Sequence, residues 1–241
     1  MKTNNIIKNV SLVLMLLPLF LSTQQAFANE DVHLDKAPID ASNHESLQRG
    51  ARTFTNYCLN CHSANYMRYN RLLEIGLTEQ QIKENLIFTG DKVGDQMKVA
   101  MNKKEAKTWF GVAPPDLSVE VRARGADWIY SYMRGFYRDS TRPTGWNNTV
   151  YDKVAMPHIL YELQGEQALN HETHELTLAK PGKLSVTEYN ALVGDLTNYL
   201  AFMSEPAKQQ RNHMGWFVLL FLGVLLVLTY KLKKAYWKDI H

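Results

Sequence analysis

The chain has 241 residues, of which 45% are hydrophobic and 21% are charged, and its formal net charge is +3. The positive excess lies at the two ends, because residues 29–208 contain 20 Lys and Arg against 23 Asp and Glu, a net charge of −3. The central part therefore lacks the basic balance of a nucleic-acid-binding protein, and its mildly acidic surface suits a weak encounter with a basic soluble protein.

The first residues have the pattern of an export signal. Lys2 and Lys8 precede an apolar run over residues 10–21, and Ala26-Phe27-Ala28 supplies the small residues of a cleavage site. We therefore predict a signal peptide over residues 1–28 and a mature chain that begins near Asn29. A retained N-terminal anchor is the alternative, although the apolar run is short for a membrane span.

An arm and a helix follow the signal. Residues 29–41 are acidic, contain Pro38 and lack periodicity, which indicates an extended arm. Ser42 and Glu45 have the spacing of a capping box, so we expect a helix to begin at Ser42. The helix then carries apolar residues at helical spacing: Leu47, Gly50, Ala51, Phe54, Tyr57 and Cys58.

This helix leads into Cys58-Leu59-Asn60-Cys61-His62, which contains the only two cysteines of the sequence. The CxxCH pattern is the attachment signature of c-type haem: two thiols form thioethers with the porphyrin and the adjacent imidazole binds the iron. A zinc half-site is a rival interpretation, but no other cysteine can complete it. A dithiol redox pair is the second rival, although the flanks lack a βαβ pattern.

In the middle of the chain the sequence predicts two helices and, between them, a rigid loop that we call the strap. Residues 78–88 form a helix that begins with the capping pair Thr78 and Gln81, and residues 126–136 form another. Between them, Ala113-Pro114-Pro115-Asp116-Leu117-Ser118 has two prolines that fix the backbone, and Pro115 is a candidate for the apolar wall of the haem pocket. Arg122, Arg124 and Arg134 are candidates to bind the haem propionates, or are simply solvated cations.

The second iron ligand has several candidates. Met156 is our prediction, because it stands in a loop before Pro157, which favours an extended backbone along a flat cofactor. His158 is the runner-up. The other methionines lie too close to His62, in segments with helical patterns or beside the membrane span: Met67, Met97, Met101, Met133, Met203 and Met214.

A long helix closes the central part. Ser185 and Glu188 form another capping pair, and Pro206 ends the helix. One apolar stripe runs along it: Tyr189, Leu192, Val193, Leu196, Tyr199, Leu200 and Met203. We expect this stripe to cross the helix that precedes the haem motif, in a fold that is mostly α with long loops.

The last segment has the composition of a membrane anchor. Residues 215–230 are almost wholly apolar, with Trp216 and Tyr230 at the edges and lysines immediately after. The positive-inside bias places the lysines in the cytoplasm. A buried core helix is the alternative, but no polar face interrupts the run. We therefore predict a signal peptide over residues 1–28, a periplasmic c-type haem domain over residues 29–208, and a C-terminal transmembrane helix with a short basic cytoplasmic tail over residues 209–241.

In order along the chain, the CxxCH motif, the Pro114-Pro115-Asp116-Leu117-Ser118 strap, the Met156 loop and the C-terminal anchor resemble the cytochrome c1 family. That family is the haem subunit of the bacterial cytochrome bc1 complex. The resemblance covers nearly all of the mature chain. CxxCH is common to all c-type cytochromes, whereas the strap and the anchor are more discriminating.

The resemblance implies one covalent haem c, with Cys58 and Cys61 as the attachment residues, His62 and Met156 as iron ligands, and Arg124 at a propionate. It implies electron transfer from a Rieske iron–sulfur protein to a soluble cytochrome c, with a b-type cytochrome as the third partner and membrane lipid around the anchor. The chain would sit in the inner membrane with its haem domain in the periplasm.

Two other functions stay open on the sequence. A membrane-anchored monohaem cytochrome could serve another respiratory oxidase or reductase, because the cysteine and histidine spacing is shared. An exported CxxC thiol-disulfide oxidoreductase belongs to a different class and would carry no haem.

Overall fold

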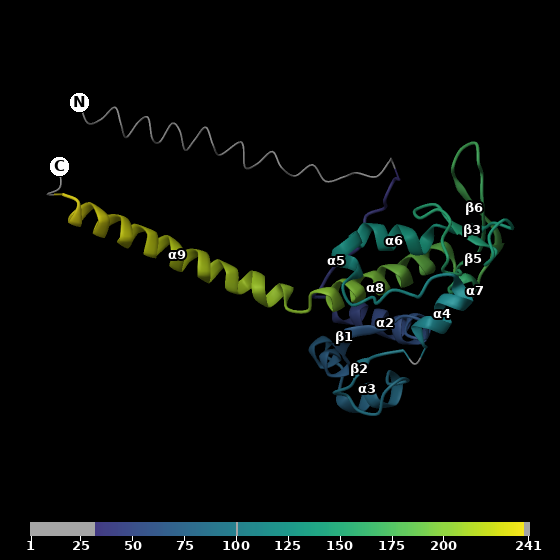
Figure 1. Ribbon diagram of the computed structural model, residues 1–241, viewed down its shortest axis with the longest axis horizontal. Coiled ribbons are helices and arrows are strands. Elements are labelled where there is room, and N and C mark those ends of the chain that lie inside the picture. Colours follow the sequence, from purple (N-terminus) through teal and green to yellow (C-terminus); the bar gives the residue numbers. More distant parts are fainter. Residues whose placement is uncertain (1–31, 100, 239–241) are drawn as a thin grey trace. The chain divides into compact units, whose positions relative to one another are not determined.

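The computed structural model describes residues 32–99 and 101–238 (Figure 1). The predicted signal peptide over residues 1–28 lies outside the described residues. The described part is mainly helical, with a few short strands, which confirms the predicted fold class.

The α-helices are α2 (His44–Thr53), α3 (Glu79–Asn85), α4 (Lys103–Phe110), α5 (Glu120–Arg124), α6 (Ala126–Arg134), α7 (Tyr161–Gln164), α8 (Val186–Ser204) and α9 (Lys208–Tyr236). A π-helical turn, η1 (Phe54–Cys58), follows α2, and a 3₁₀ helix, η2 (Tyr69–Ile75), follows the first strand. The strands are β1 (Ala64–Arg68), β2 (Gln96–Met97), β3 (Phe136–Arg138), β4 (Trp146–Asn148), β5 (Gly165–Leu169) and β6 (Leu176–Pro181). They pair antiparallel as β1–β2, β3–β4 and β5–β6.

The predicted crossing of two distant helices is present between α2 and α8 (Figure 1). Gly50 lies at the point of contact: a Cβ there would come within 2.1 Å of the carbonyl oxygen of Asp195 and 2.6 Å of the Cβ of Tyr199. One turn later the rings of Phe54 and Tyr199 pack with centroids 5.6 Å apart. Glycine is therefore required for the two backbones to approach this closely.

Two of the three predicted capping boxes are confirmed. Thr78 caps α3 with Gln81, and Ser185 caps α8 with Glu188, each with both reciprocal hydrogen bonds. The box at Ser42 is wrong, because Asn43 is the N-cap of α2 and its side chain accepts a hydrogen bond from the Ser46 amide. The Ser42 hydroxyl instead donates to Asp40, which closes a turn before the helix.

Several predicted element boundaries need correction. α3 ends at Asn85 rather than at residue 88, and α6 ends at Arg134 because Phe136 already pairs with Asn148 in the β3–β4 hairpin. Met97 does not lie in a helix, since it belongs to β2 and is fully buried. Tertiary pairing of short strands overrides the helical pattern at Phe136 and Met97.

The predicted extended arm is confirmed over the residues that the structure describes. Residues 32–40 have no regular structure, and from residue 34 on they contact α6 and α8. The Ala37 amide donates to the Asp127 carboxylate at 2.8 Å, and the Asp40 amide donates to the Asn198 side chain at 3.0 Å. The arm is thus fastened at two points to the helices that carry the core.

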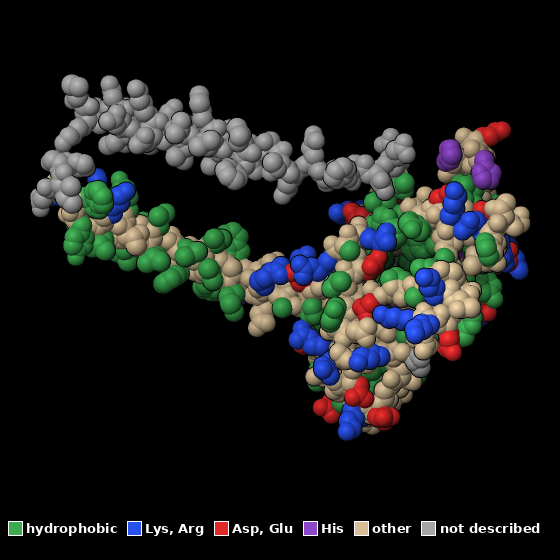
Figure 2. Space-filling model, viewed as in Figure 1, with side chains coloured by type: hydrophobic (Ala, Val, Ile, Leu, Met, Phe, Trp, Pro, Cys, Tyr) green, Lys and Arg blue, Asp and Glu red, His purple; other side chains and the backbone are tan. Residues whose placement is uncertain are grey.

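α9 is the one candidate membrane span among the described residues, over Gln210–Tyr236, and an 18-residue window within it has a mean hydropathy of 2.1. None of that apolar window is buried against the rest of the chain. Figure 2 shows hydrophobic side chains along the length of the helix. A helix with this composition and exposure needs a lipid or protein environment to cover it.

Candidate functional site

The haem motif begins at a local irregularity of the helix. In the π-helical turn Phe54–Cys58, the Leu59 amide donates to the Phe54 carbonyl oxygen at 3.0 Å, a separation of five residues. Phe54 is fully buried against α8, whereas Cys58 is 7% exposed. Wide turns of this kind are frequent at functional sites. Here the turn places the first cysteine at the end of a helix whose opposite side packs against α8.

Both cysteines are free thiols, with Cys58 buried and Cys61 partly exposed. Burial raises the pKa of Cys58 to about 12 and also raises the pKa of Cys61. A dithiol oxidoreductase needs the opposite, a thiol whose pKa is lowered so that it attacks as thiolate. The environment of the two thiols therefore argues against thiol-disulfide exchange. A zinc centre is also unsupported, because no group of three or more His, Cys, Asp or Glu in the described residues could hold a metal ion.

The imidazole of His62 is held in one orientation by the strap. Its Nδ1 lies 2.8 Å from the carbonyl oxygen of Pro115, and since a carbonyl can only accept, Nδ1 is the protonated nitrogen. Burial lowers the pKa of His62, although the Pro115 hydrogen bond partly offsets this. The ring is therefore neutral at pH 7. No hydrogen bond among the described residues uses Nε2, so its lone pair can bind a metal.

The strap is fastened to the chain that follows the motif. The Leu117 amide donates to the Ser63 carbonyl oxygen at 2.9 Å, and the buried Ser118 hydroxyl accepts from the Tyr66 amide at 3.0 Å. The Asp116 carboxylate accepts from both the amide and the side chain of Asn65, at 2.9 and 2.6 Å. These contacts explain how the carbonyl oxygen of Pro115 keeps a fixed position beside His62.

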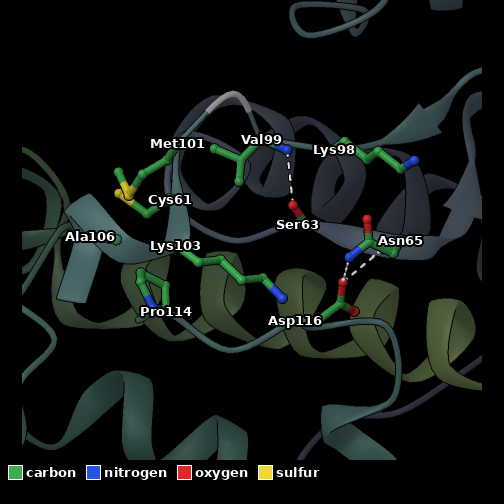
Figure 3. Close-up of a pocket in the computed structure, with 10 residues that line it drawn as sticks. All are labelled: Cys61, Ser63, Asn65, Lys98, Val99, Met101, Lys103, Ala106, Pro114 and Asp116. Atoms are coloured by element: carbon green, nitrogen blue, oxygen red, sulfur yellow. Dashed lines mark hydrogen bonds between the residues drawn. The ribbon is translucent and has the colours of Figure 1, made fainter. Parts of the chain in front are cut away.

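A pocket of about 340 Å³ opens beside Cys61 (Figure 3). Its walls come from the motif, the strap and the segment around α4: Cys61, Ser63, Asn65, Lys98, Val99, Met101, Lys103, Ala106, Pro114 and Asp116. Figure 3 shows the Ser63 hydroxyl accepting from the Val99 amide and Asn65 bonded to Asp116. Open space therefore borders Cys61. A residue to which a cofactor becomes attached needs such space.

Met156 lies in the loop between β4 and α7 and is partly buried. Its side chain packs against the main core and also against the smaller cluster of Phe136, Trp146 and Val154. The Tyr132 hydroxyl donates to its sulfur at 3.4 Å. A thioether sulfur has two lone pairs, so one remains for a metal.

His158, the runner-up, is enclosed by aromatic rings. Its ring stacks on Phe136 with centroids 4.8 Å apart and planes 3° apart, and Trp146 meets it edge-on at 5.0 Å. Burial lowers the pKa of His158 to about 4, although an interaction with the Gln164 side chain partly offsets this. The contacts with Phe136 and Trp146 make His158 a buried packing residue, which favours Met156 as the ligand.

The remaining methionines are mostly packing residues, as expected for this side chain. Met67 and Met97 are at most 1% exposed, and Met133 and Met203 are also buried in the core. Met101 differs, since it lines the pocket beside Cys61. Met214 lies in α9 and is exposed.

The three candidate arginines differ in their partners. Arg134 already has two partners, since its Nε donates to the Asn190 side chain and one of its terminal nitrogens pairs with Asp35. Arg124 pairs with Glu120 through Nε only, so its terminal nitrogens have no hydrogen bond among the described residues. Its guanidinium lies 4.4 Å above the ring of Trp128. Arg122 is exposed on α5. Of the three, Arg124 best retains the free donors that a carboxylate needs.

Sequence reasoning missed Trp128 and Tyr132. Together with Arg124 they form a ladder: the guanidinium covers Trp128, and Trp128 stacks on Tyr132 with centroids 4.8 Å apart. The spacing of four residues between Trp128 and Tyr132 was a usable signal, because both lie on α6 and such residues share one side of a helix, whereas Arg124 belongs to α5 and had no such signal. The contact from Tyr132 to Met156 had no such signal.

Comparison with known proteins decides the family. The model of the family described as Cytochrome C1 matches residues 34–240. The chain belongs to the cytochrome c1 family. Cytochrome c1 of Allochromatium vinosum is 47% identical over 220 residues, which are 87% of this chain and 90% of the relative. Cytochrome c1 of Rhodospirillum rubrum is 28% identical, over 80% of this chain and 81% of the relative.

Another similar protein carries a different name. The ammonia monooxygenase gamma subunit of Nitrosomonas europaea is 55% identical over 214 residues, which are 89% of this chain and 92% of the relative. The cytochrome c1 match nevertheless extends over nearly all of the described residues.

Membership in the cytochrome c1 family gives the function and the cofactor. The chain is the haem-carrying electron-transfer subunit of the bc1 complex in a respiratory chain, and it carries one covalently attached haem c. Bacterial cytochrome c1 is anchored in the membrane, and α9 fits that role. The residues at the site fit the cofactor: two free thiols stand next to a neutral imidazole whose Nε2 has no other use.

Proposed function

We propose that this chain accepts one electron from a Rieske iron–sulfur protein and passes it to a soluble cytochrome c. The observation that carries the proposal is the orientation of His62, whose Nδ1 is engaged by Pro115 while Nε2 stays free beside two unpaired thiols. When bound, the haem supplies reversible one-electron chemistry at iron.

The residues of this chain bind and tune rather than make bonds. Cys58 and Cys61 would hold the porphyrin through thioethers, and His62 and Met156 would bind the iron. A thioether ligand would raise the reduction potential of the bound haem. Arg124 offers its terminal nitrogens to a propionate, and Pro115 fixes the imidazole through its carbonyl oxygen.

The membrane arrangement follows from the two ends. Cleavage near Asn29 leaves the haem domain in the periplasm, and α9 crosses the inner membrane once with the lysine-rich end in the cytoplasm. Beside a b-type cytochrome in the membrane, the anchor holds the domain where a tethered Rieske protein meets it often, which raises the effective concentration. The haem domain comprises residues 29–208, and residues 209–241 form the anchor and tail.

Haem staining on a denaturing gel tests attachment, with Cys58→Ser and Cys61→Ser as variants. We expect a covalently stained band for the native chain, a weakened band for either single variant and none when both cysteines are replaced. A stained band in the double variant would refute attachment at this motif.

A redox titration tests the axial ligands. Met156→Leu should lower the midpoint potential sharply, because the thioether is lost. Met97→Leu is the matched control, since it removes a buried methionine that the proposal does not place at the iron. An unchanged potential in Met156→Leu would move the assignment to another residue, with His158→Phe as the next variant to titrate.

A second candidate is a membrane-anchored cytochrome that serves a different enzyme. The name of the Nitrosomonas europaea relative, an ammonia monooxygenase gamma subunit, is the observation that favours it. Affinity purification of the tagged chain from detergent-solubilised membranes separates the two. Recovery of a b-type cytochrome and a Rieske protein supports the first function, whereas recovery of a monooxygenase without them supports the second.

A further inference from the structure

Met156 has a hydrogen-bond donor of its own within the haem domain. The hydroxyl oxygen of Tyr132, on α6, lies 3.4 Å from the Met156 sulfur, which belongs to a loop 24 residues later. The contact joins a rigid helix to a loop without regular structure. The helix can therefore determine where the sulfur of the loop is held.

Tyr132 itself has little freedom to move. Its ring stacks on Trp128 with planes 11° apart, and Phe136 meets it edge-on with centroids 5.1 Å apart. Its carbonyl oxygen accepts a hydrogen bond from the Asn148 side chain at 2.7 Å, which fixes the end of α6. A phenol is protonated at neutral pH, and its hydroxyl is the donor in the contact with the Met156 sulfur.

We propose that Tyr132 is a positioning residue for Met156, whose hydroxyl fixes the sulfur by donating to one lone pair and thereby raises the reduction potential of the haem. The proposal rests on the role of Met156 as an iron ligand in the proposed function. The second lone pair of the sulfur is the one that the hydrogen bond leaves for the iron.

The direction of the effect follows from electron donation. A hydrogen bond to the sulfur withdraws electron density from it, so the thioether becomes a weaker donor. Ferric iron depends more on ligand donation than ferrous iron does, and the reduced form is therefore favoured. Hydrogen bonds outside the first coordination shell commonly tune metal sites in this way.

Tyr132→Phe in the full-length chain, within the solubilised complex, removes only the hydroxyl. We expect a lower midpoint potential and a shifted sulfur-to-iron charge-transfer band in the oxidised spectrum, with covalent haem unchanged. Imidazole should displace the methionine about fivefold more readily, the size of effect that one neutral hydrogen bond gives.

The molecule offers a matched control in Tyr199. Its hydroxyl donates to the sulfur of Met97 at 3.6 Å, a bond of the same kind at a buried methionine that we do not place at the iron. Tyr199→Phe should leave the potential, the band and the imidazole affinity as in the native protein. A Tyr132→3-fluorotyrosine chain, whose phenol is a stronger donor, should shift the potential upward.

Three outcomes overturn the proposal. The first is a Tyr132→Phe protein with native potential and spectrum, and the second is equal shifts in Tyr132→Phe and Tyr199→Phe, which would indicate general loosening of the core. The third is a downward shift with 3-fluorotyrosine. Failure of the underlying ligand assignment is distinguishable, because Met156→Leu would then retain the charge-transfer band.

Discussion

The Nδ1 atom of His62 and the carbonyl oxygen of Pro115 are 2.8 Å apart although 53 positions separate them in the chain. The acceptor belongs to the backbone, so its position depends on how the strap is held rather than on the proline side chain alone. The contacts of Asp116, Leu117 and Ser118 with residues 63–66 hold it. The orientation of the proposed iron ligand is thus determined by a short stretch of polar contacts next to the motif.

Asp116 should make the stability of the protein depend on acid pH. Burial raises the pKa of this carboxyl, but hydrogen bonds from Ser118 and Asn65 outweigh burial, so the pKa lies below its usual value. A lowered pKa in the folded state stabilises the protein above the unfolded pKa, about 4, and this stabilisation is lost as the pH falls further. Thermal unfolding from pH 7 to pH 3 should show a smaller acid dependence in Asp116→Asn than in the native chain. Asp91→Asn, at an exposed position, should keep the native dependence.

Arg124→Gln should lower the midpoint potential. A cation near the haem favours the reduced state, and the free terminal nitrogens of Arg124 are those best placed to meet a propionate. Arg134→Gln is the control, since that arginine is already paired with Asp35 and Asn190. Redox titration of both variants measures the difference. If Arg134→Gln shifts the potential more than Arg124→Gln, the assignment of Arg124 is wrong.

Gly50→Ala should destabilise the fold by about 1–3 kcal/mol, the usual range for overpacking, or more. The added methyl group would meet the Asp195 carbonyl oxygen at 2.1 Å, and backbone cannot move aside as a flexible side chain can. Gly94→Ala makes a matched control, because a Cβ there meets nothing within 4 Å. Thermal unfolding monitored by circular dichroism compares the two, and similar melting temperatures would contradict the close crossing of α2 and α8.

Val224→Lys should weaken membrane retention. Val224 is near the middle of the candidate span Gln210–Tyr236, where a lysine costs about 2.5–3.5 kcal/mol for insertion. Extraction of membranes with alkaline carbonate should release more of this variant than of the native chain. Val224→Leu preserves the apolar surface and should stay in the membrane fraction. Equal retention of both would count against α9 as a span.

The sequence alone predicted the parts of the fold that depend on local patterns. Thr78 with Gln81 and Ser185 with Glu188 are reciprocal caps that need only four consecutive residues, and both were found. Ser42 failed because the neighbouring Asn43 competes for the same role and wins. The extra length predicted for α6 failed because Phe136 pairs with Asn148, a contact that no helical pattern reveals.

The candidate site likewise has parts that the sequence predicts and parts that it does not. The CxxCH motif is contiguous, so its residues could be named from the sequence, and Met156 could be singled out by the proline that follows it. The contacts of His62 with Pro115 and of Met156 with Tyr132 join distant segments. They depend on tertiary packing, so one sequence without its structure does not contain a direct signal for them.

The π-helical turn over Phe54–Cys58 determines which way Cys58 points relative to the core. Successive residues of an α-helix are about 100° apart around its axis, and a π turn holds one residue more than an α turn. Because the π turn takes up one residue more over the same rotation, deleting one residue there lets it rewind as an α turn that leaves Cys58 facing nearly the same way, while Gly50 stays against α8. An inserted residue has no such outlet, because the turn already holds its extra one, so an insertion between Gly50 and Cys58 should rotate the thiol by about 100° and be tolerated far worse than a deletion.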